Sequence, residues 1–133
     1  MTDAPRITVL IIDDNPVDRQ TYRRFLEEAS PAYLVHEARD GRSGLDAVDL
    51  LQPDCVLLDL KLTDQSGYEV LDRLAGEGSL RRIPVVMLSG LTMKALADGA
   101  RSLGAHSYLI KGRFDKKELD NTVRAALACE RGQ

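Results

Sequence analysis

The chain has 133 residues, of which 44% are hydrophobic, and its 18 basic and 21 acidic side chains give a net charge of −3. A chain of this length buries about two thirds of the surface that it exposes when unfolded, so it needs no disulfide or structural metal to hold a core. The acidic balance excludes the strongly basic footprint of a nucleic-acid-binding protein, and we predict no direct nucleic-acid binding.

The sequence also bears on the cellular compartment. No apolar run approaches the length of a membrane span, and residues 1–6 lack the layout of a signal peptide. Cys55 lies inside an apolar run and is predicted to be a core residue, whereas Cys129 lies near the C-terminal end. Neither belongs to a Cys-x-x-Cys motif or a Cys/His cluster, which favours a reducing compartment. We therefore predict a cytoplasmic protein without membrane insertion.

Apolar runs rich in β-branched residues predict strands that are buried on both faces. The clearest run is ITVLII at residues 7–12, and CVLL at residues 55–58 is similar. The five predicted strands span residues 7–12, 33–38, 55–58, 84–88 and 107–110.

Capping residues and helical spacing predict a helix after each strand. Asn15 is the expected N-cap of the first helix, with Pro16 at the first helical position. Ser66 and Glu69 form a capping-box pattern, and Gly104 is the expected C-cap of the fourth helix. The first helix is predicted to bury a face formed by Val17, Thr21, Phe25 and Ala29. The helices are predicted to begin at Pro16, span 41–51, begin at Ser66, span 92–103, and run from 115 to about 130.

Strands that alternate with amphipathic helices predict a parallel sheet with helices on both faces, which is a doubly wound (βα)5 sandwich. We expect one domain over residues 1–133 with a core at about 6–129. The strand order 2-1-3-4-5 is expected by analogy with known flavodoxin-like folds, since the spacing of apolar residues does not specify it.

Polar side chains follow four of the predicted strands. Asp13 and Asp14 follow the first strand, Asp59 the third, Ser89 the fourth and Lys111 the fifth. Ligands of doubly wound sheets bind at the carboxyl ends of the strands, so these residues are predicted to converge on one site.

Several carboxylates in one site repel one another, by roughly 4 kcal/mol for a pair about 4 Å apart at an effective dielectric near 20. A hard divalent cation removes this conflict, and an all-oxygen ligand set fits Mg²⁺ better than Zn²⁺. Asp59 could then act as a nucleophile that forms an aspartyl phosphate, with Lys111 and the Ser89 hydroxyl donating to phosphate oxygens.

Four segments in this order resemble the response-regulator receiver family of two-component signalling, over essentially the whole chain. They are VLIIDDNPVDR, VLLDLKLTDQSGYEVL, IPVVMLSG and SYLIKG. The resemblance implies one role for each matching residue: Asp13 and Asp14 form the metal-binding pair, Asp59 is the phosphoacceptor and a metal ligand, Lys61 gives a backbone carbonyl to the metal, Ser89 and Tyr108 are the switch residues, and Lys111 contacts phosphate.

The resemblance further implies a partner and an output. A sensor histidine kinase or a phosphotransfer protein would supply the phosphoryl group to Asp59 with Mg²⁺ bound. The surface of the fourth helix, fifth strand and fifth helix would then switch, and a homodimer is a further expectation. The protein would not be an enzyme beyond catalysing its own phosphorylation and dephosphorylation. No effector domain is expected after the last helix, so the chain could be a stand-alone regulator or part of a longer one.

Two positions depart from the family pattern. Gly112 follows the lysine where the family usually has proline, commonly with a cis bond, and glycine does not impose that isomer cheaply. We therefore expect the loop 112–114 to be shaped differently and to be more mobile. Thr63 occupies a place that is often proline.

Plainer structural interpretations stay open for each residue. Asp13 and Asp14 could be turn residues that lead into the helix cap. Ser89 could be an ordinary turn hydroxyl and Lys111 a solvated lysine. Tyr108 could serve packing alone.

Two other function classes use a similar fold or similar residues. A phosphatase or phosphotransferase of the haloacid-dehalogenase type would need a second aspartate two residues after Asp59, where this chain has Lys61. A flavodoxin-like FMN module would need a phosphate-binding loop after the first strand, and DDNPVD would repel phosphate unless a metal were bound. A pseudo-receiver, which would serve only as an interaction domain, would usually lack one of the acidic or lysine positions, and here all of them are present.

Overall fold

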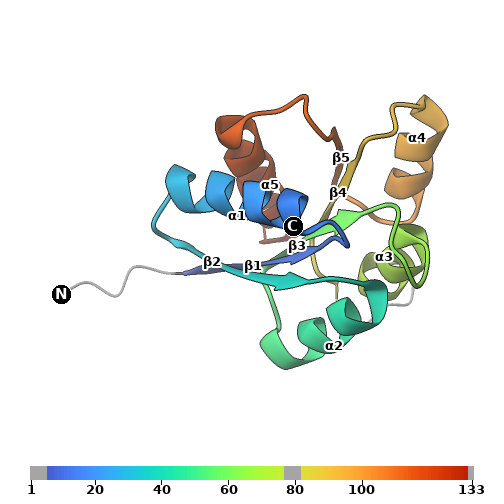
Figure 1. The fold of residues 1–133 in the computed structure, drawn as a ribbon, viewed down its shortest axis with the longest axis horizontal. Coiled ribbons are helices and arrows are strands. Elements are labelled where there is room, and N and C mark those ends of the chain that lie inside the picture. Colours follow the sequence, from blue (N-terminus) through green and yellow to red (C-terminus); the bar gives the residue numbers. More distant parts are fainter. Residues whose placement is uncertain (1–5, 77–81, 132–133) are drawn as a thin grey trace.

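A computed structural model describes residues 6–76 and 82–131 of the chain. The ends of the predicted domain, residues 1–5 and 132–133, lie outside the described residues. Five strands and five helices alternate (Figure 1). They are β1 (Ile7–Ile12), α1 (Pro16–Ala29), β2 (Tyr33–Ala38), α2 (Gly41–Leu51), β3 (Cys55–Asp59), α3 (Gly67–Ala75), β4 (Val85–Ser89), α4 (Lys94–Ser102), β5 (Ser107–Ile110) and α5 (Lys116–Arg131).

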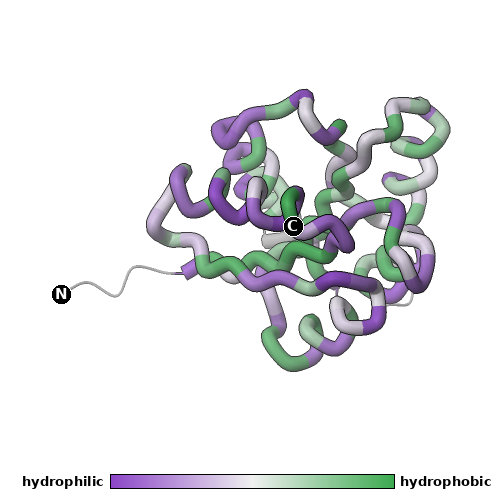
Figure 2. Tube along the Cα trace, in the orientation of Figure 1, coloured by the Kyte–Doolittle hydropathy of each residue, from purple (hydrophilic) through white to green (hydrophobic). Residues whose placement is uncertain are grey.

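The strands form one parallel sheet in the order β2-β1-β3-β4-β5, which confirms the predicted topology. Helices α1 and α5 cover one face, and α2, α3 and α4 cover the other (Figure 1). Hydrophobic residues follow the central strands and hydrophilic residues cover the outer side of α1 (Figure 2). Within the described part of the chain, no helix is both long enough and apolar enough to cross a membrane.

The two faces of the sheet carry separate cores because side chains alternate along each strand. Leu10, Ile12 and Leu58 pack under α2 and α3, whereas Ile11 and Leu57 pack under α1 and α5. Cys55 is fully buried, as predicted, and Cys129 is exposed. All residues of β3 are buried, which fits its position in the middle of the sheet.

The predicted buried face of α1 is only partly right: Phe25 packs, partly buried, against the core, but the buried residues of the helix lie one position further along. Val17 is 67% exposed, and the buried residues of this helix are Tyr22 and Leu26. The predicted start is correct, because Asn15 caps the helix and Pro16 begins it. The predicted spacing of four residues is correct, but the buried residues Tyr22 and Leu26 each follow a predicted one by one position. Since each residue turns a helix by about 100°, this offset rotates the buried face by the same angle.

The bounds of several further elements differ from the prediction, the simplest case being β3, which extends one residue further, to Asp59. β4 spans Val85–Ser89. It begins after Pro84 because proline has no N–H to donate to the sheet, although the Pro84 carbonyl accepts a bond of 3.0 Å from Val56 N. α4 spans Lys94–Ser102 with Leu103 as its C-cap, and Gly104 follows in the left-handed region at φ +106°.

Gly67 allows the start of α3 to lie directly against the end of β3, where Asp59 is located. A Cβ at this position would meet the Asp59 carbonyl oxygen and would lie 2.8 Å from Leu60 Cα. We expect Gly67→Ala to lower the free energy of unfolding by about 1–3 kcal/mol, because rigid backbone would have to shift. Urea denaturation measures this change.

Gly90→Ala is the matched control, since a Cβ there meets no heavy atom within 4 Å. Its free energy of unfolding should stay within about 0.5 kcal/mol of the wild type. Equal stability of the two variants would contradict the close approach of α3 to β3.

Candidate functional site

Three carboxylates meet at the carboxyl edge of the sheet. β1 leads into Asp13 and Asp14, and Asp59 is the last residue of the neighbouring strand β3. One oxygen from each of the three side chains lies within 4.8 Å of the others. Asp13 is 1% exposed and Asp59 is 7% exposed, so two of these carboxylates are buried. The predicted convergence of the strand-end acids is confirmed.

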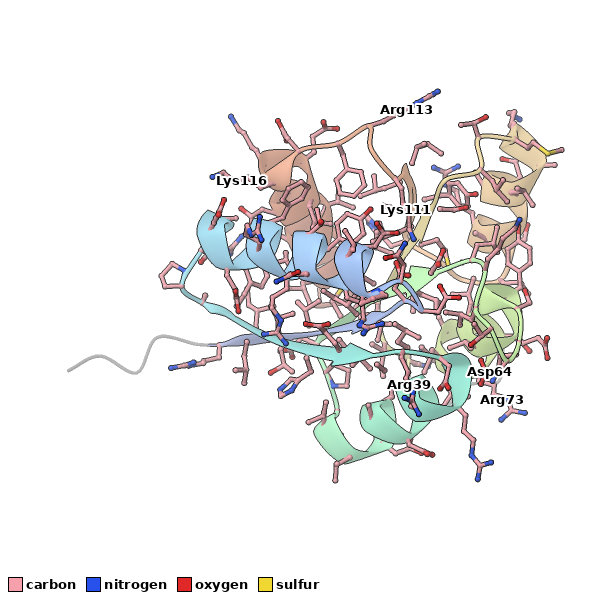
Figure 3. The ribbon with its side chains drawn as sticks, viewed as in Figure 1. Arg39, Asp64, Arg73, Lys111, Arg113 and Lys116 are labelled. Carbon is pink, nitrogen blue, oxygen red and sulfur yellow. The ribbon has the colours of Figure 1, made fainter. Side chains whose placement is uncertain are left out.

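Lys111 brings a positive charge to the same edge from the end of β5 (Figure 3). Its Nζ lies 2.8 Å from Asp13 Oδ2 and 3.3 Å from Asp59 Oδ2. A third carboxylate oxygen, Asp18 Oδ2 on the first turn of α1, lies 2.9 Å away. The side chain of Lys111 is only 17% exposed, so it is not the solvated lysine of the plainer interpretation.

Burial and charge act in opposite directions on this cluster. Burial, followed by the negative charge of Asp13, raises the pKa of Asp59 to about 6, although Lys111 opposes the shift. Burial alone would lower the pKa of Lys111, but hydrogen bonds to Asp13 and Asp18 outweigh it and raise that pKa well above its usual range. The lysine is therefore held charged, while Asp59 carries an uncompensated cost of ionisation.

The backbone that follows β1 fixes the orientation of Asp13. Its Oδ1 accepts a bond of 2.9 Å from Asn15 N, so the residue that caps α1 also orients the carboxylate. The Arg19 guanidinium donates to the Asp13 carbonyl oxygen at 2.7 Å. Asp13 thus takes part in the turn, as the plainer interpretation allowed, and still presents its Oδ2 to Lys111.

Ser89 and Tyr108 both contact the backbone of Leu91, at the turn between β4 and α4. The buried Ser89 Oγ accepts a bond of 3.0 Å from Leu91 N. The Tyr108 hydroxyl donates to the Leu91 carbonyl oxygen at 2.9 Å, and its ring packs in the core beneath α4. The two predicted switch residues therefore hold the same short segment, and a role in switching stays a prediction.

Lys61 lies two residues after Asp59, in the loop before α3. Its backbone N–H donates to Asp59 Oδ1 at 3.4 Å, and Lys61 forms an antiparallel bridge with Ser66. This loop is thereby held close to the carboxylate. Metal binding by the Lys61 carbonyl stays a prediction.

The loop after β5 has a conformation that proline could not adopt. Gly112 has φ +82°, in the left-handed region, whereas proline is fixed near −65°. This conformation bears out the predicted difference in shape from a loop that carries proline, whereas the greater mobility of the loop stays a prediction. Phe114 anchors the far side of the loop by stacking on Tyr22 with ring centroids 5.5 Å apart. Arg113, between Gly112 and Phe114 in the sequence, points away from the molecule (Figure 3).

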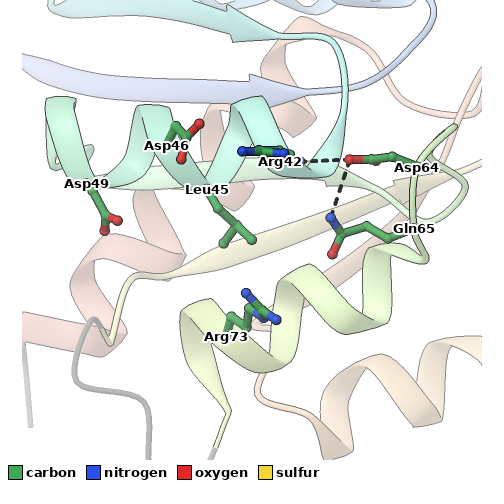
Figure 4. Close-up of a pocket in the computed structure, with 7 residues that line it drawn as sticks. All are labelled: Arg42, Leu45, Asp46, Asp49, Asp64, Gln65 and Arg73. Carbon is green, nitrogen blue, oxygen red and sulfur yellow. Dashed lines mark hydrogen bonds between the residues drawn. The ribbon is translucent and has the colours of Figure 1, made fainter.

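A hollow of about 480 Å³ lies between α2 and α3, and its lining does not include the strand-end acids (Figure 4). Asp64 lies on its edge and accepts bonds of 2.8 and 2.9 Å from the N–H groups of Gly41 and Arg42. Asp64 therefore holds the first turn of α2, which explains its position structurally.

Sequence reasoning missed Asp18 as a partner of Lys111 beside the site. The available signal was an acidic residue in the first turn of the helix that follows Asp13 and Asp14. Its contact with Lys111 joins residues 93 positions apart, so it depends on the packing of α1 beside the end of β5.

The fold and this edge define a doubly wound domain whose polar site holds three carboxylates and a half-buried lysine. Residues 9–124 match the family described as the response regulator receiver domain, and the chain belongs to that family. Domains of this family are signalling phosphoacceptors: they receive phosphoryl groups from kinases on an aspartate, and they generally bind Mg²⁺.

Individual relatives agree with this assignment. The nitrate/nitrite response regulator protein NarP of Escherichia coli K12 is 33% identical over 94% of this chain and 57% of its own length. The polar-differentiation response regulator DivK of Brucella ovis is 33% identical over 78% of this chain and 83% of its own length. The structure of the chemotaxis response regulator CheY4 of Vibrio cholerae has a TM-score of 0.78 at 25% identity, over 91% of this chain and 98% of that one. The chain thus spans less than two thirds of NarP.

The raised pKa of Asp59 predicts a pH-dependent stability. In metal-free protein, folded Asp59 binds protons up to about pH 6, whereas the unfolded chain releases them near 3.8. The free energy of unfolding should therefore fall as the pH rises between these values. We expect Asp59→Asn in EDTA to be more stable than the wild type above pH 6, with a difference that shrinks toward pH 4.

Urea denaturation across this pH range measures the effect. Asp98→Asn is the control, because it makes the same change of charge on the exposed side of α4. A stability difference between Asp59→Asn and the wild type that did not vary with pH would contradict the predicted cost of ionising Asp59.

Proposed function

We propose that this chain is a phosphoacceptor in a two-component phosphorelay, in which Asp59 receives the phosphoryl group with Mg²⁺ bound. The observation that supports this most directly is the meeting of Asp13, Asp14 and Asp59 within 4.8 Å, with Lys111 Nζ 3.3 Å from Asp59. One positive charge against three carboxylates leaves an excess of negative charge at a largely buried edge. A structural turn would not need such a concentration of charge.

The donor set fits Mg²⁺. Its side-chain ligand atoms are all carboxylate oxygens, which are the ligands that this hard cation takes. Asp13, Asp14 and Asp59 would hold the ion together with the backbone carbonyl of Lys61. When bound, the ion neutralises charge on the carboxylates and on phosphoryl oxygens.

Asp59 and Lys111 have different roles in the proposed phosphoryl transfer. An oxygen of Asp59 attacks the phosphorus of a phosphohistidine, so a P–O bond forms while the P–N bond to the donor breaks and the imidazole leaves with the bond electrons. Lys111 donates hydrogen bonds to the phosphoryl oxygens as negative charge is transferred. Water later cleaves the aspartyl phosphate at the same edge, so the protein acts on itself and on no separate substrate.

Phosphorylation of Asp59 would change the conformation of the protein through Ser89 and Tyr108. Both hold the backbone of Leu91, at 3.0 and 2.9 Å, so a Ser89 hydroxyl that turns toward phosphate releases one of the two bonds on this segment. Tyr108 would follow, and the surface formed by α4, β5 and α5 would change. The shift is limited to the difference in phosphate affinity between the two states.

The proposal also covers the organisation and partners of the protein. Residues 1–133 form one receiver domain with its core at about 6–129, in line with the family match over 9–124. A sensor histidine kinase or a phosphotransfer protein supplies the phosphoryl group. A homodimer remains a further prediction.

Labelling tests the acceptor. With Mg²⁺ and acetyl phosphate, intact-mass measurement should show one added phosphoryl group on the wild type and none on Asp59→Asn, because the nucleophile is gone. EDTA should abolish labelling of the wild type. Asp98→Asn should label like the wild type, since its side chain pairs with Lys94 on α4. Equal labelling of Asp59→Asn would reject the assignment.

NMR with Mg²⁺ and beryllofluoride, a phosphoryl mimic, tests the switch. We expect shifts at Ser89, Leu91 and the Tyr108 ring, and then along α4 and α5, because these residues share hydrogen bonds. Ser89→Ala should retain beryllofluoride binding but reduce the shift of the Tyr108 ring. Shifts confined to the residues around Asp59 would rule out this route and favour the Gly112 loop.

A further inference from the structure

The Lys111 ammonium has three carboxylate partners, and only two of them belong to the proposed phosphoacceptor site. Its Nζ donates to Asp13 Oδ2 at 2.8 Å and to Asp18 Oδ2 at 2.9 Å, and it lies 3.3 Å from Asp59 Oδ2. An ammonium group has three N–H donors and no acceptor, so the hydrogen bonds to Asp13 and Asp18 occupy two of them. A phosphoryl oxygen at Asp59 can therefore take a second donor of this lysine only if Asp13 or Asp18 gives up its bond.

Asp18 is the partner that the reaction does not draw away. A metal ion would take up charge of Asp13 and Asp59, and the phosphoryl group would be attached to Asp59 itself. Asp18 lies outside the group of carboxylates whose oxygens could share one ion, which comprises Asp13, Asp14 and Asp59. Its charge therefore stays beside Lys111 at every stage.

The start of α1 holds Asp18 in this position. Its backbone N–H donates to the Asn15 cap at 3.3 Å, and a carboxylate in the first turn of a helix is stabilised by the helix dipole. The next residue, Arg19, is directed elsewhere, to the Asp13 carbonyl oxygen and to Glu37. The Asp18 side chain is 30% exposed and that of Lys111 is 17% exposed, so solvent screens their contact only in part.

We propose that Asp18 competes with the phosphoryl group for Lys111, and so acts as a positioning residue that weakens phosphoryl binding at Asp59. The inference rests on the proposed function, because it assigns Lys111 to the phosphoryl group. Asp18 withdraws one donor from the lysine and offsets part of its positive charge. Its removal should therefore free Lys111 for the phosphoryl oxygens.

Beryllofluoride affinity measures this competition without phosphoryl transfer. With Mg²⁺ saturating, ¹⁹F NMR titration should show Asp18→Asn binding beryllofluoride about two- to fivefold more tightly than the wild type, the size expected for a partly exposed ion pair. Asp18→Glu keeps the charge and should restore affinity close to that of the wild type. Asp46→Asn, which removes an exposed charge on α2, outside the proposed switching surface, should leave the affinity unchanged.

A second background separates competition for Lys111 from a general effect of charge or folding. In Lys111→Ala the same Asp18→Asn change should have no effect on beryllofluoride affinity, because the shared partner is gone. The rate of labelling by acetyl phosphate gives the same comparison if that variant binds too weakly to titrate.

The outcomes distinguish this inference from the proposed function. Absence of beryllofluoride binding and of labelling in the wild type overturns the phosphoacceptor role, and the role of Asp18 with it. Normal binding by the wild type, with Asp18→Asn unchanged or weaker, overturns the inference alone. An equal gain in affinity from Asp18→Asn with and without Lys111 also overturns it, because the effect would then not pass through the lysine.

Discussion

The Lys111 ammonium lies 2.8 Å from Asp13 and 3.3 Å from Asp59, and this contact joins the ends of β1, β3 and β5. Both carboxylates are more than nine tenths buried, and a buried charge is costly unless it is paired. The lysine offsets part of their charge, and burial still raises the pKa of Asp59 to about 6. A site that is short of positive charge is suited to a divalent cation and to a reaction that depends on charge neutralisation.

Backbone groups next to these carboxylates help to hold them in place. Asn15 caps α1 and orients Asp13 through its N–H, while Gly67 lets α3 begin directly against the Asp59 carbonyl. The same residues that start two helices therefore also position two carboxylates. A substitution that damages a helix start here should alter the site as well as the stability.

The loop after Lys111 has glycine at position 112, where the resemblance to the family predicts proline. Gly112 takes a left-handed conformation, and Phe114 stacks on Tyr22 of α1, whose ring also contacts Phe25 edge-on at 6.0 Å. Aromatic packing between α1 and Phe114 therefore constrains the far side of this loop. The loop and α1 are coupled in this way on the side of the site where Asp18 lies.

The sequence by itself determined the alternation of strands and helices, the caps at Asn15 and Ser66, and the acids that end the strands, because these depend on local spacing and capping. It did not determine the buried face of α1, since a helix offset by one residue keeps the same spacing. Only the tertiary structure showed that Tyr22 and Leu26 face the sheet, and that Asp18 reaches Lys111 across 93 positions of sequence. The contact between Asp18 and Lys111 depends on how α1 packs beside the end of β5, and a local sequence pattern does not predict how two distant segments pack.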